Sequence, residues 1–324
     1  MRCREQLALW SLLALALTAF TQPGVAQAGN EFHRTLPVTV ADPVNLDVEL
    51  PQGDLQIAYG REGQVSIAAV AQVATEAKVD DKKLATALSI EQDGNHLKIR
   101  HQPGAGQAEG DIRMIYRIDV PYRTEVHSVM DKGKQTITGI MGPVHAVTNR
   151  GDIKVSYLSK GLLAEAGSGN LDLQVIGERV EAKTGEGNIS CVRVAQGVSA
   201  ETEDGDITLM VVGPSTATVK TGSGRIDVGG ARGSLTGSTQ GGDLHVKAVP
   251  HDDWQLNSTS GNIRIELPQT AALQVDATTK SGEILIDRDD MHGPDTGVRQ
   301  FHHRVDAGGI HIAANTDGGK IVIR

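Results

Sequence analysis

Apolar and polar residues alternate in short runs from about residue 144 to the end of the chain, and a glycine interrupts them at a nearly constant interval. Each of these glycines is followed by a polar or charged residue and then by Ile or Leu. Successive glycines lie 18 or 19 residues apart, with one spacing of 21, and they are Gly151, Gly169, Gly187, Gly205, Gly224, Gly242, Gly261 and Gly282, with a late copy at Gly319. A fixed period of this length predicts a repeat architecture.

The residues at fixed distances from each glycine are also alike. The positions seven before and four after it are mostly large and apolar, and the position five before it is mostly small. The position three before it is usually threonine: Thr148, Thr184, Thr202, Thr221, Thr239, Thr279 and Thr316. Because successive side chains of a strand point to opposite faces, these columns predict two short strands per repeat, joined at the glycine, with one face of each directed inward.

Two all-β architectures fit this repeat. In a β-solenoid of 18–19-residue two-strand repeats, each repeat is one coil, and like residues stack about 4.8 Å apart along the axis. In an antiparallel β-meander, the glycines would lie in hairpin loops, and an intervening strand would separate like residues. The threonine column favours the solenoid, since only there does self-stacking give a reason to repeat one residue type. Glycine suits the corner because it accepts a positive φ, and the Asp or Asn that often follows can hydrogen-bond nearby backbone.

The remaining segments indicate further regions. We expect residues 1–28 to be a signal peptide, residues 29–125 to be an N-terminal β-rich capping region, and residues 126–324 to be the solenoid with an insertion at 287–309. The cap would cover the unpaired backbone groups of the first coil. It contains several alternating runs that predict strands, and a polar stretch at 76–88 predicts a short helix. The insertion is either a degenerate coil or a lid over the distal end.

The first residues have the features of an export signal. Arg2 and Arg4 precede an apolar run over residues 7–20, and residues 26–28 offer a small-residue cleavage site. The mature chain would begin near Gly29 and be periplasmic, at the cell surface or secreted. No later run reaches the roughly 20 apolar residues that a spanning helix needs. We therefore expect no membrane span after signal cleavage.

Composition narrows the choice of fold and partner. The chain has 38 glycines, 3% aromatic residues and a formal net charge of −9. Small and β-branched side chains suit a thin solenoid interior, which aromatic rings would overfill. The charges are spread along the chain without a basic cluster that could follow a phosphate backbone. Nucleic acid is therefore not an expected partner.

No cofactor, metal site or catalytic site is expected. A calcium ladder along the residues after the corner glycines is disfavoured because Arg225, Glu283 and Lys320 break that column, so turn formation explains it. The histidines of the distal insertion lack a recognised metal-ligand spacing, and they are predicted to lie in a solvated loop with one nearby carboxylate: His302, His303, His311 and Asp306.

The nearest candidates for an enzyme are two acidic loops. Polysaccharide lyases and hydrolases on solenoids need clustered carboxylates, and the chain offers Asp252, Asp253, Asp287, Asp289 and Asp290. Neither loop has a neighbouring aromatic platform for a sugar, since Trp254, next to Asp253, falls in an inward column, so we interpret these carboxylates as solvated turn charges.

Three other features have structural interpretations. The tripeptide at residues 150–152 matches an integrin-binding motif, but Gly-Asp recurs at this corner for structural reasons. Cys191 shares an inward column with Val, Leu and Ile, so we expect a buried and inert thiol. Trp254 falls in the inward column seven before its glycine and is expected in the core.

Three segments resemble the putative-adhesin family of bacterial envelope proteins built from a β-strand repeat. They are residues 118–121 (Ile-Asp-Val-Pro), residues 142–153, which include the first marker glycine, and residues 316–321 at the final marker. The resemblance spans nearly the whole mature chain. It implies a solenoid-like β-repeat in an envelope or extracellular setting, and it brings no catalytic motif.

These observations predict an exported, non-enzymatic envelope or surface protein. It would be an adhesin or interaction scaffold whose flat solenoid faces bind an unidentified protein or glycan of the envelope or surface. Two alternatives remain at this point. One is a polysaccharide-active enzyme on a β-helix that uses the acidic loops, and the other is an envelope-stress sensor or scaffold that engages a partner through residues 287–309.

Overall fold

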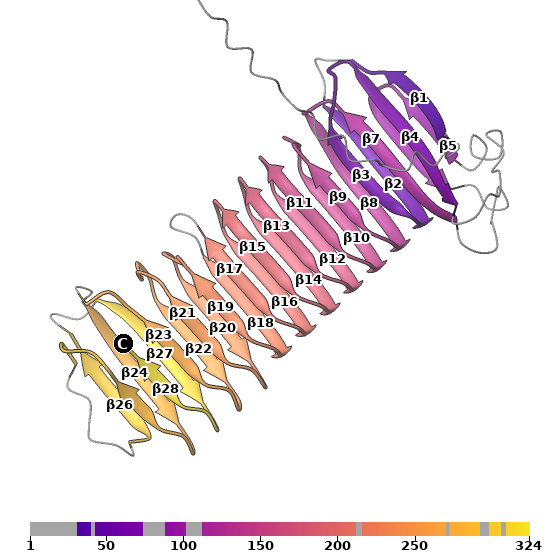
Figure 1. Ribbon diagram of the computed structural model, residues 1–324. Helices are drawn as coiled ribbons and strands as arrows, with labels where there is room; N and C mark the ends of the chain where they lie inside the picture. The colour runs from indigo at the N-terminus through magenta and orange to yellow at the C-terminus, as the bar shows by residue number, and fades with distance from the viewer. Residues whose placement is uncertain are drawn as a thin grey trace, which may run out of the picture.

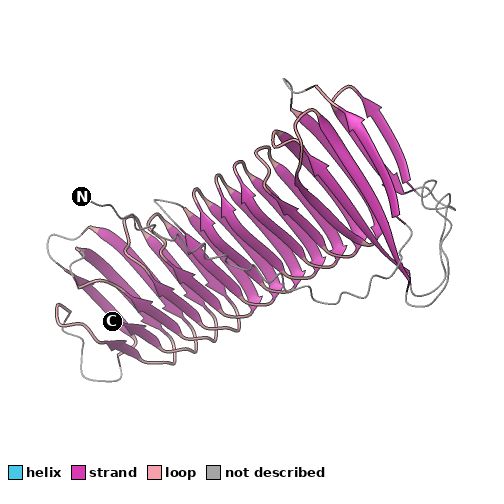
Figure 2. Ribbon diagram, turned by 45° about the horizontal axis from the view of Figure 1, so that its top comes forward, coloured by secondary structure: helices cyan, strands magenta, loops and turns pink. Residues whose placement is uncertain are grey.

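Two long sheets face each other along a straight rod in the computed structural model (Figures 1 and 2). The structure describes residues 31–39, 43–73, 88–101, 112–211, 216–269, 272–291, 298–305 and 309–324. Each sheet has 14 strands, and the described residues contain no helix. The predicted all-β solenoid is confirmed. None of the described segments is a helix that could cross a membrane.

The first sheet, sheet A, contains the strand that follows each corner glycine. In spatial order its strands are β1 (Glu31–Pro37), β4 (Gln64–Val73), β7 (Ile112–Val120), β3 (Asp54–Tyr59), β9 (Gln135–Thr138), β11 (Ile153–Leu158), β13 (Leu171–Ile176), β15 (Ile189–Val194), β17 (Ile207–Val211), β19 (Ile226–Gly229), β21 (Leu244–Lys247), β23 (Ile263–Glu266), β28 (Ile321–Ile323) and β25 (Ile284–Ile286).

The second sheet, sheet B, contains the strand that precedes each corner glycine. In spatial order its strands are β26 (Gln300–Arg304), β24 (Leu273–Thr279), β27 (Ile310–Thr316), β22 (Trp254–Ser258), β20 (Leu235–Thr239), β18 (Ala217–Ser223), β16 (Val198–Asp204), β14 (Val180–Glu186), β12 (Leu162–Ser168), β10 (Val144–Arg150), β8 (Thr124–Lys132), β2 (Val44–Gln52), β6 (His96–His101) and β5 (Leu88–Asp93).

Like residues lie beside like residues along both sheets. In sheet B, β14 pairs parallel with β16, and Thr184 faces Thr202. In sheet A, β13 pairs parallel with β15, and Leu173 faces Cys191. The inward side chains of the two sheets form one continuous core along the rod. Parallel pairing of strands one repeat apart excludes the meander alternative.

The corner glycines touch each other from coil to coil. A methyl group on any of the nine predicted glycines would lie 1.8–2.2 Å from the carbonyl oxygen of the neighbouring corner glycine. Four of them also have the expected positive φ, between 142° and 149°, and these are Gly151, Gly169, Gly187 and Gly205. The other five do not, so positive φ explains only part of the column. Close approach of two backbones is the requirement that all nine share.

The threonines hydrogen-bond the same corners. Thr202 Oγ1 donates to the carbonyl oxygen of Gly187 at 3.0 Å, and this contact joins one coil to the preceding corner. Equivalent bonds of 2.9–3.2 Å are donated by Thr184, Thr221, Thr239, Thr279 and Thr316. Thr148 is equally buried, but its hydroxyl has no hydrogen-bond partner among the described residues. Because each bond satisfies a buried hydroxyl, the column is compatible with an apolar interior.

The residues after the corner glycines form a second ladder, outside the core. Asn188 N donates to Asn170 Oδ1 at 2.9 Å, and Asp206 N donates to Asn188 Oδ1 at 2.8 Å. Asp152, Asp206, Asp243 and Asn262 accept equivalent backbone bonds from the next coil. The polar residues at this position therefore bind the backbone of the neighbouring coil as well as forming their own turn.

The opposite corner has an unusual backbone conformation. Tyr157, Val175 and Arg193, each six residues after a corner glycine, have φ angles of 58°, 57° and 58°. The same position is Gly139 (φ 73°) and Gly230 (φ 72°) in two other coils. A left-handed conformation is unfavourable for residues with a Cβ, most of all for a β-branched one. Three successive coils thus keep side chains where glycine would fit with less strain.

The order of coils at both ends differs from the order along the chain. The coil formed by β2 and β3 lies between the coil of β6 and β7 and the coil of β8 and β9. At the other end, the coil of β27 and β28 lies between that of β22 and β23 and that of β24 and β25. The late glycine copy, Gly319, accordingly contacts Gly261 on one side and Gly282 on the other.

Antiparallel strands cover the ends of the stack. β1 and β4 extend sheet A beyond β7, and β5 extends sheet B beyond β6. At the distal end, β26, from the predicted insertion, pairs antiparallel with β24 and buries Phe301. The segment therefore adds a covering strand and not a further coil. The predicted signal peptide at 1–28 and most of the helix predicted at 76–88 lie outside the described residues, and Leu88 begins β5.

Adjacent glycines allow a test of the corner contact. A Cβ at Gly242 would lie 1.8 Å from Gly224 O, whereas the nearest atom to a Cβ at Gly241 is 3.8 Å away, and neither residue has a positive φ. We expect Gly242→Ala to lower the stability of the array by about 2 kcal/mol through overpacking, and Gly241→Ala to leave it nearly unchanged. Guanidinium denaturation followed by circular dichroism measures both, and equal midpoints would contradict the steric explanation.

The left-handed corner generates a second prediction. Val175→Gly removes an unfavourable conformation of about 1 kcal/mol, partly offset by the greater chain entropy of glycine when unfolded. We expect its melting temperature to equal or exceed that of the wild type. The matched control is Val192→Gly, on the next strand, where φ is ordinary and we expect a loss of about 1 kcal/mol. A melting temperature that falls equally in both variants would show that Val175 is not strained.

The last coils generate a third prediction, on pH. The guanidinium of Arg324, which donates to Glu266, and the His245 ring at 3.2 Å lower the pKa of the Glu266 carboxyl from 4.5 to about 2. A depressed pKa stabilises the folded state above the unfolded pKa, and this contribution is lost as pH falls. We expect Glu266→Gln to melt earlier than the wild type at pH 6, with the difference shrinking between pH 4.5 and 2. A difference that stays constant over this range would contradict the assignment.

Candidate interaction surface

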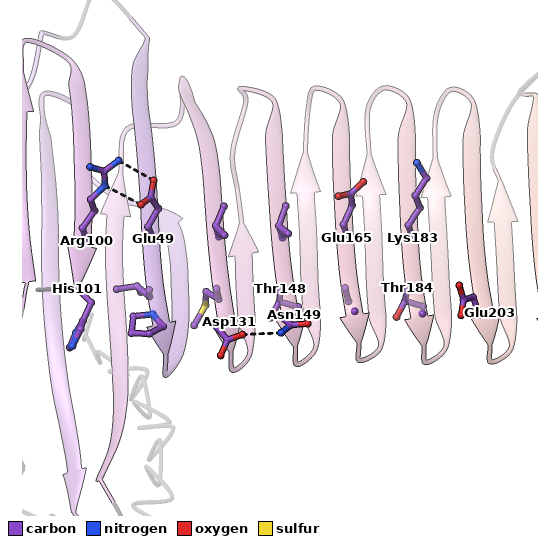
Figure 3. Close-up of a pocket in the computed structure, with 18 of the residues that line it drawn as sticks. Glu49, Arg100, His101, Asp131, Thr148, Asn149, Glu165, Lys183, Thr184 and Glu203 are labelled. Atoms are coloured by element: carbon purple, nitrogen blue, oxygen red, sulfur yellow. Dashed lines mark hydrogen bonds and ion pairs between the residues drawn. The ribbon is translucent and has the colours of Figure 1, made fainter. Parts of the chain in front are cut away.

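A shallow groove of about 1160 Å³ crosses the outer face of sheet B beside the glycine corners. It runs from β6 across β2, β8, β10, β12 and β14 to β16, so that each strand contributes a few side chains (Figure 3). One row of lining residues continues from Arg100 and Glu49 to Glu165 and Lys183, and a second row contains Asp131, Asn149 and Glu203. The groove therefore depends on the register of seven strands.

Glycines lower the floor of the groove between the two rows. Gly167 and Gly185 lie two residues before corner glycines, at the position that holds Asn149 and Glu203 in flanking coils. A Cβ at Gly185 would lie 2.5 Å from Gly167 O. The missing side chains leave a depression bordered by polar groups. Gly-x-Gly at residues 167–169 and 185–187 is the sequence signal from which this depression could have been recognised.

Carboxylates outnumber cations in the groove. Its lining includes five carboxylates, Glu49, Asp131, Glu165, Glu201 and Glu203, and two cationic side chains, Arg100 and Lys183. The surface is therefore acidic near neutral pH.

Several of these charged groups are already paired. Arg100 donates to Glu49 at 3.1 Å, and Asn149 donates to Asp131 at 2.9 Å. Lys183 donates to Glu181 at 2.7 Å, and this contact raises the pKa of Lys183 and lowers that of Glu181. Exposed pairs of this kind contribute little stability. Their main effect is to hold the long side chains in defined positions along the rim.

The acidic loops predicted as enzyme candidates make structural contacts. Asp290 binds the buried guanidinium of Arg288, and this contact lowers the pKa of the Asp290 carboxyl. Asp253 Oδ1 accepts a hydrogen bond from His311 N at 2.8 Å, and Asp252 Oδ1 accepts one from Asp253 N at 2.8 Å. These carboxylates therefore shape the loops before β22 and after β25.

The distal histidines surround one carboxylate. His302 binds one oxygen of Asp276, and His311 binds the other at 2.5 Å; these hydrogen bonds outweigh burial and lower the pKa of Asp276. The His303 ring stacks on Phe301 with centroids 5.8 Å apart. Asp306 lies outside the described residues. Within the described ranges, no group of three or more His, Cys, Asp or Glu residues has a geometry that could hold a metal ion.

The remaining predicted positions are structural. Cys191 is fully buried, and burial raises the pKa of its thiol to about 12. Trp254 is 1% exposed, and its indole donates to Gly233 O at 3.2 Å. In the tripeptide at 150–152, Asp152 Oδ1 accepts the backbone N–H of Asn170 at 2.8 Å. This side chain is part of the ladder beside the corners.

Solved structures of bacterial proteins are similar to this chain at low sequence identity. A putative lipid binding protein from Parabacteroides distasonis is 16% identical with a TM-score of 0.47, over 92% of this chain and 98% of its own. A putative adhesin from Bacteroides fragilis is 10% identical with a TM-score of 0.38, over 91% and 97%. A putative cell adhesion protein from Clostridium sporogenes is 10% identical with a TM-score of 0.23, over 91% and 98%.

Family membership rests on a match to a family model. No curated protein matches the chain. The model of the Toastrack DUF4097 family matches residues 44–324, a range that contains the whole solenoid. The chain belongs to the Toastrack DUF4097 family.

Proposed function

We propose that this protein is exported and acts in the envelope or at the cell surface as a non-enzymatic, adhesin-like interaction scaffold. The groove on sheet B is the observation that carries the proposal. Its lining residues come from seven strands that are far apart in sequence, and the parallel register alone brings them together. A surface held by continuous ladders is preorganised, so that little ordering entropy is lost when a partner binds.

The charge of the groove indicates the character of its partner. Five carboxylates against two cations favour a basic protein segment or another cationic surface. The rows of side chains repeat at the strand spacing of about 4.8 Å, which suits an extended partner lying along the axis. The positive start and apolar run of residues 1–20 support export.

The chemistry of the acidic loops favours binding over catalysis. Asp290 is committed to Arg288, and Asp253 to the backbone of β27. A polysaccharide-active enzyme would need paired carboxylates free to exchange protons with a substrate. The loops therefore support a scaffold role better than an enzymatic one.

Charge reversal in the groove tests the proposal. Glu165→Lys and Glu203→Lys change side chains on the outer face of sheet B without altering the core. We expect the double variant to reduce attachment of cells carrying the protein, or affinity for an isolated envelope partner, by about tenfold, with an unchanged melting temperature. The matched control is Asp289→Lys, an exposed carboxylate in the distal loop. Equal attachment by all variants would remove the groove from the function.

A further inference from the structure

The exposed aromatic side chains of the described chain gather at one place. Tyr59, Tyr122 and Tyr157 are 53%, 37% and 66% exposed, and Met141 beside them is 45% exposed. Tyr116, Trp254 and Phe301 are buried instead. In a chain with only 3% aromatic residues, three exposed tyrosines within four adjacent coils form a distinct surface. Tyrosine combines an apolar ring with a polar hydroxyl and is typical of binding surfaces.

These side chains form two short columns at the corner opposite the glycines. The first column follows β3, β9, β11, β13 and β15 and contains Tyr59, Gly139, Tyr157, Val175 and Arg193. The second column contains Tyr122, which follows β7, and Met141, which follows β9. We call the two columns together the tyrosine ridge.

Contacts along the ridge hold its parts together. Tyr122 lies edge-on to Tyr59 with ring centroids 6.1 Å apart, and Met141 N donates to Tyr122 O at 2.7 Å. Gly139 adds no side chain between Tyr59 and Tyr157. A shallow hollow of about 680 Å³, lined by Tyr157, Val175 and Arg193, continues the ridge toward β15.

Backbone strain is the independent sign that these side chains have a role. Tyr157, Val175 and Arg193 have left-handed φ angles of 57–58°, where Gly139 and Gly230 occupy the same position in other coils. The fold therefore accepts glycine at this corner. Strained conformations that persist where a less strained residue would fit are typical of functional sites. Tyr157 and Arg193 also point away from the core, so that packing does not account for them.

We propose that the tyrosine ridge binds an acidic polysaccharide that lies along the solenoid axis. This inference rests on the proposed interaction function and assigns it a second surface and a ligand class. The tyrosine rings supply faces for the C–H surfaces of pyranose rings. Arg193 at one end and Arg61, two residues after Tyr59, at the other supply cations for the carboxylates of the sugar.

The charges of the ridge favour an anionic ligand. Arg61 and Arg193 are exposed, and neither forms an ion pair with another described residue. This contrasts with the acidic groove and with the net charge of −9 for the whole chain. Two carboxylates lie at the Tyr59 end of the ridge: Glu62 accepts the backbone N–H of Tyr122 at 3.1 Å, and the exposed Asp119 lies beside Gly60. Guanidinium groups bind carboxylates with two parallel hydrogen bonds when both are free to do so.

The shape of the ridge favours a linear polymer over a protein. Protein interfaces involve roughly 20–30 residues on each side, whereas the ridge consists of six side chains in two columns. Its positions repeat at the strand spacing of about 4.8 Å, close to the length of one sugar unit in an extended polysaccharide. Gly139 occupies the coil between Tyr59 and Tyr157, so an extended polymer with a matching repeat can place alternate sugar rings on these two tyrosines.

The test measures binding of the purified full chain to polygalacturonate and alginate, with dextran and hydroxyethylcellulose as neutral probes, by affinity electrophoresis and calorimetry. We expect binding to the acidic polymers, weakened tenfold or more by Tyr157→Gly and by Arg193→Gly. Both variants should melt at or above the wild-type temperature, because glycine relieves the left-handed strain. Misfolding is thus separated from loss of the site. Tyr157→Phe should retain binding, and Val249→Ala, an exposed apolar residue away from the ridge, should not change it.

Three outcomes would overturn the inference. The first is that the wild type binds no acidic polymer. The second is that the two glycine variants bind acidic polymers as tightly as the wild type does. The third is that the wild type binds acidic and neutral polymers with equal affinity. A photo-crosslinker at position 157 that captures an envelope protein in place of polysaccharide would likewise assign the ridge to a protein partner. None of these outcomes bears on the Glu165 and Glu203 variants, so a failure of the ridge is distinguishable from a failure of the groove.

Discussion

The structure depends on the contact between corner glycines of adjacent coils. At each corner two backbones approach so closely that any side chain would overlap the neighbouring carbonyl oxygen, as at Gly187 and Gly169. This approach keeps both sheets in register, because a coil displaced along its neighbour would place a Cβ in the gap. On the inside, the hydroxyl of Thr202 donates to the carbonyl oxygen of Gly187, and on the outside, the side-chain oxygen of Asn188 accepts the N–H of Asp206, so that both bonds join the same two coils. The backbone contacts at the corners thus fix the register of the coils, and the packing of the inward side chains follows from this register.

Because the corner contacts and the inward columns hold the fold together, the outward positions are free to vary. Inward columns must hold residues of matched size, since the interior between two facing sheets is thin and close-packed. Outward side chains have no such constraint, and their differences create local character on a uniform rod. An acidic groove results where glycines and carboxylates coincide on sheet B, and a tyrosine-rich ridge results where three coils retain side chains at a strained corner. The two surfaces therefore differ in charge and in aromatic content.

Much of the fold could be predicted from the sequence because the contact between corner glycines recurs in every repeat. The interval between glycines, the threonines three residues before them and the alternating apolar columns all follow from one contact, so nine copies report the same constraint. The order of the terminal coils could not be predicted in this way. Gly282 and Gly319 carry the same local signature, and either could follow Gly261. The groove and the ridge depend on single residues such as Gly185 and Tyr157. Their part in a surface can be recognised only when the neighbouring coils are placed beside them.

The inserted terminal coils have a consequence for how the protein can change in length. β2 and β3 at one end, and β27 and β28 at the other, are each enclosed between two other coils, and antiparallel strands lie beyond them. Both ends thus have a strand order of their own, although at the distal end the covering strand β26 extends sheet B alone and β25 is the last strand of sheet A. The interior coils between β10 and β23 are joined only to their immediate neighbours through equivalent contacts. Duplication or deletion of one 18-residue unit there would shift the two ends apart or together without altering either, which makes rod length an evolutionary variable independent of how the ends are sealed.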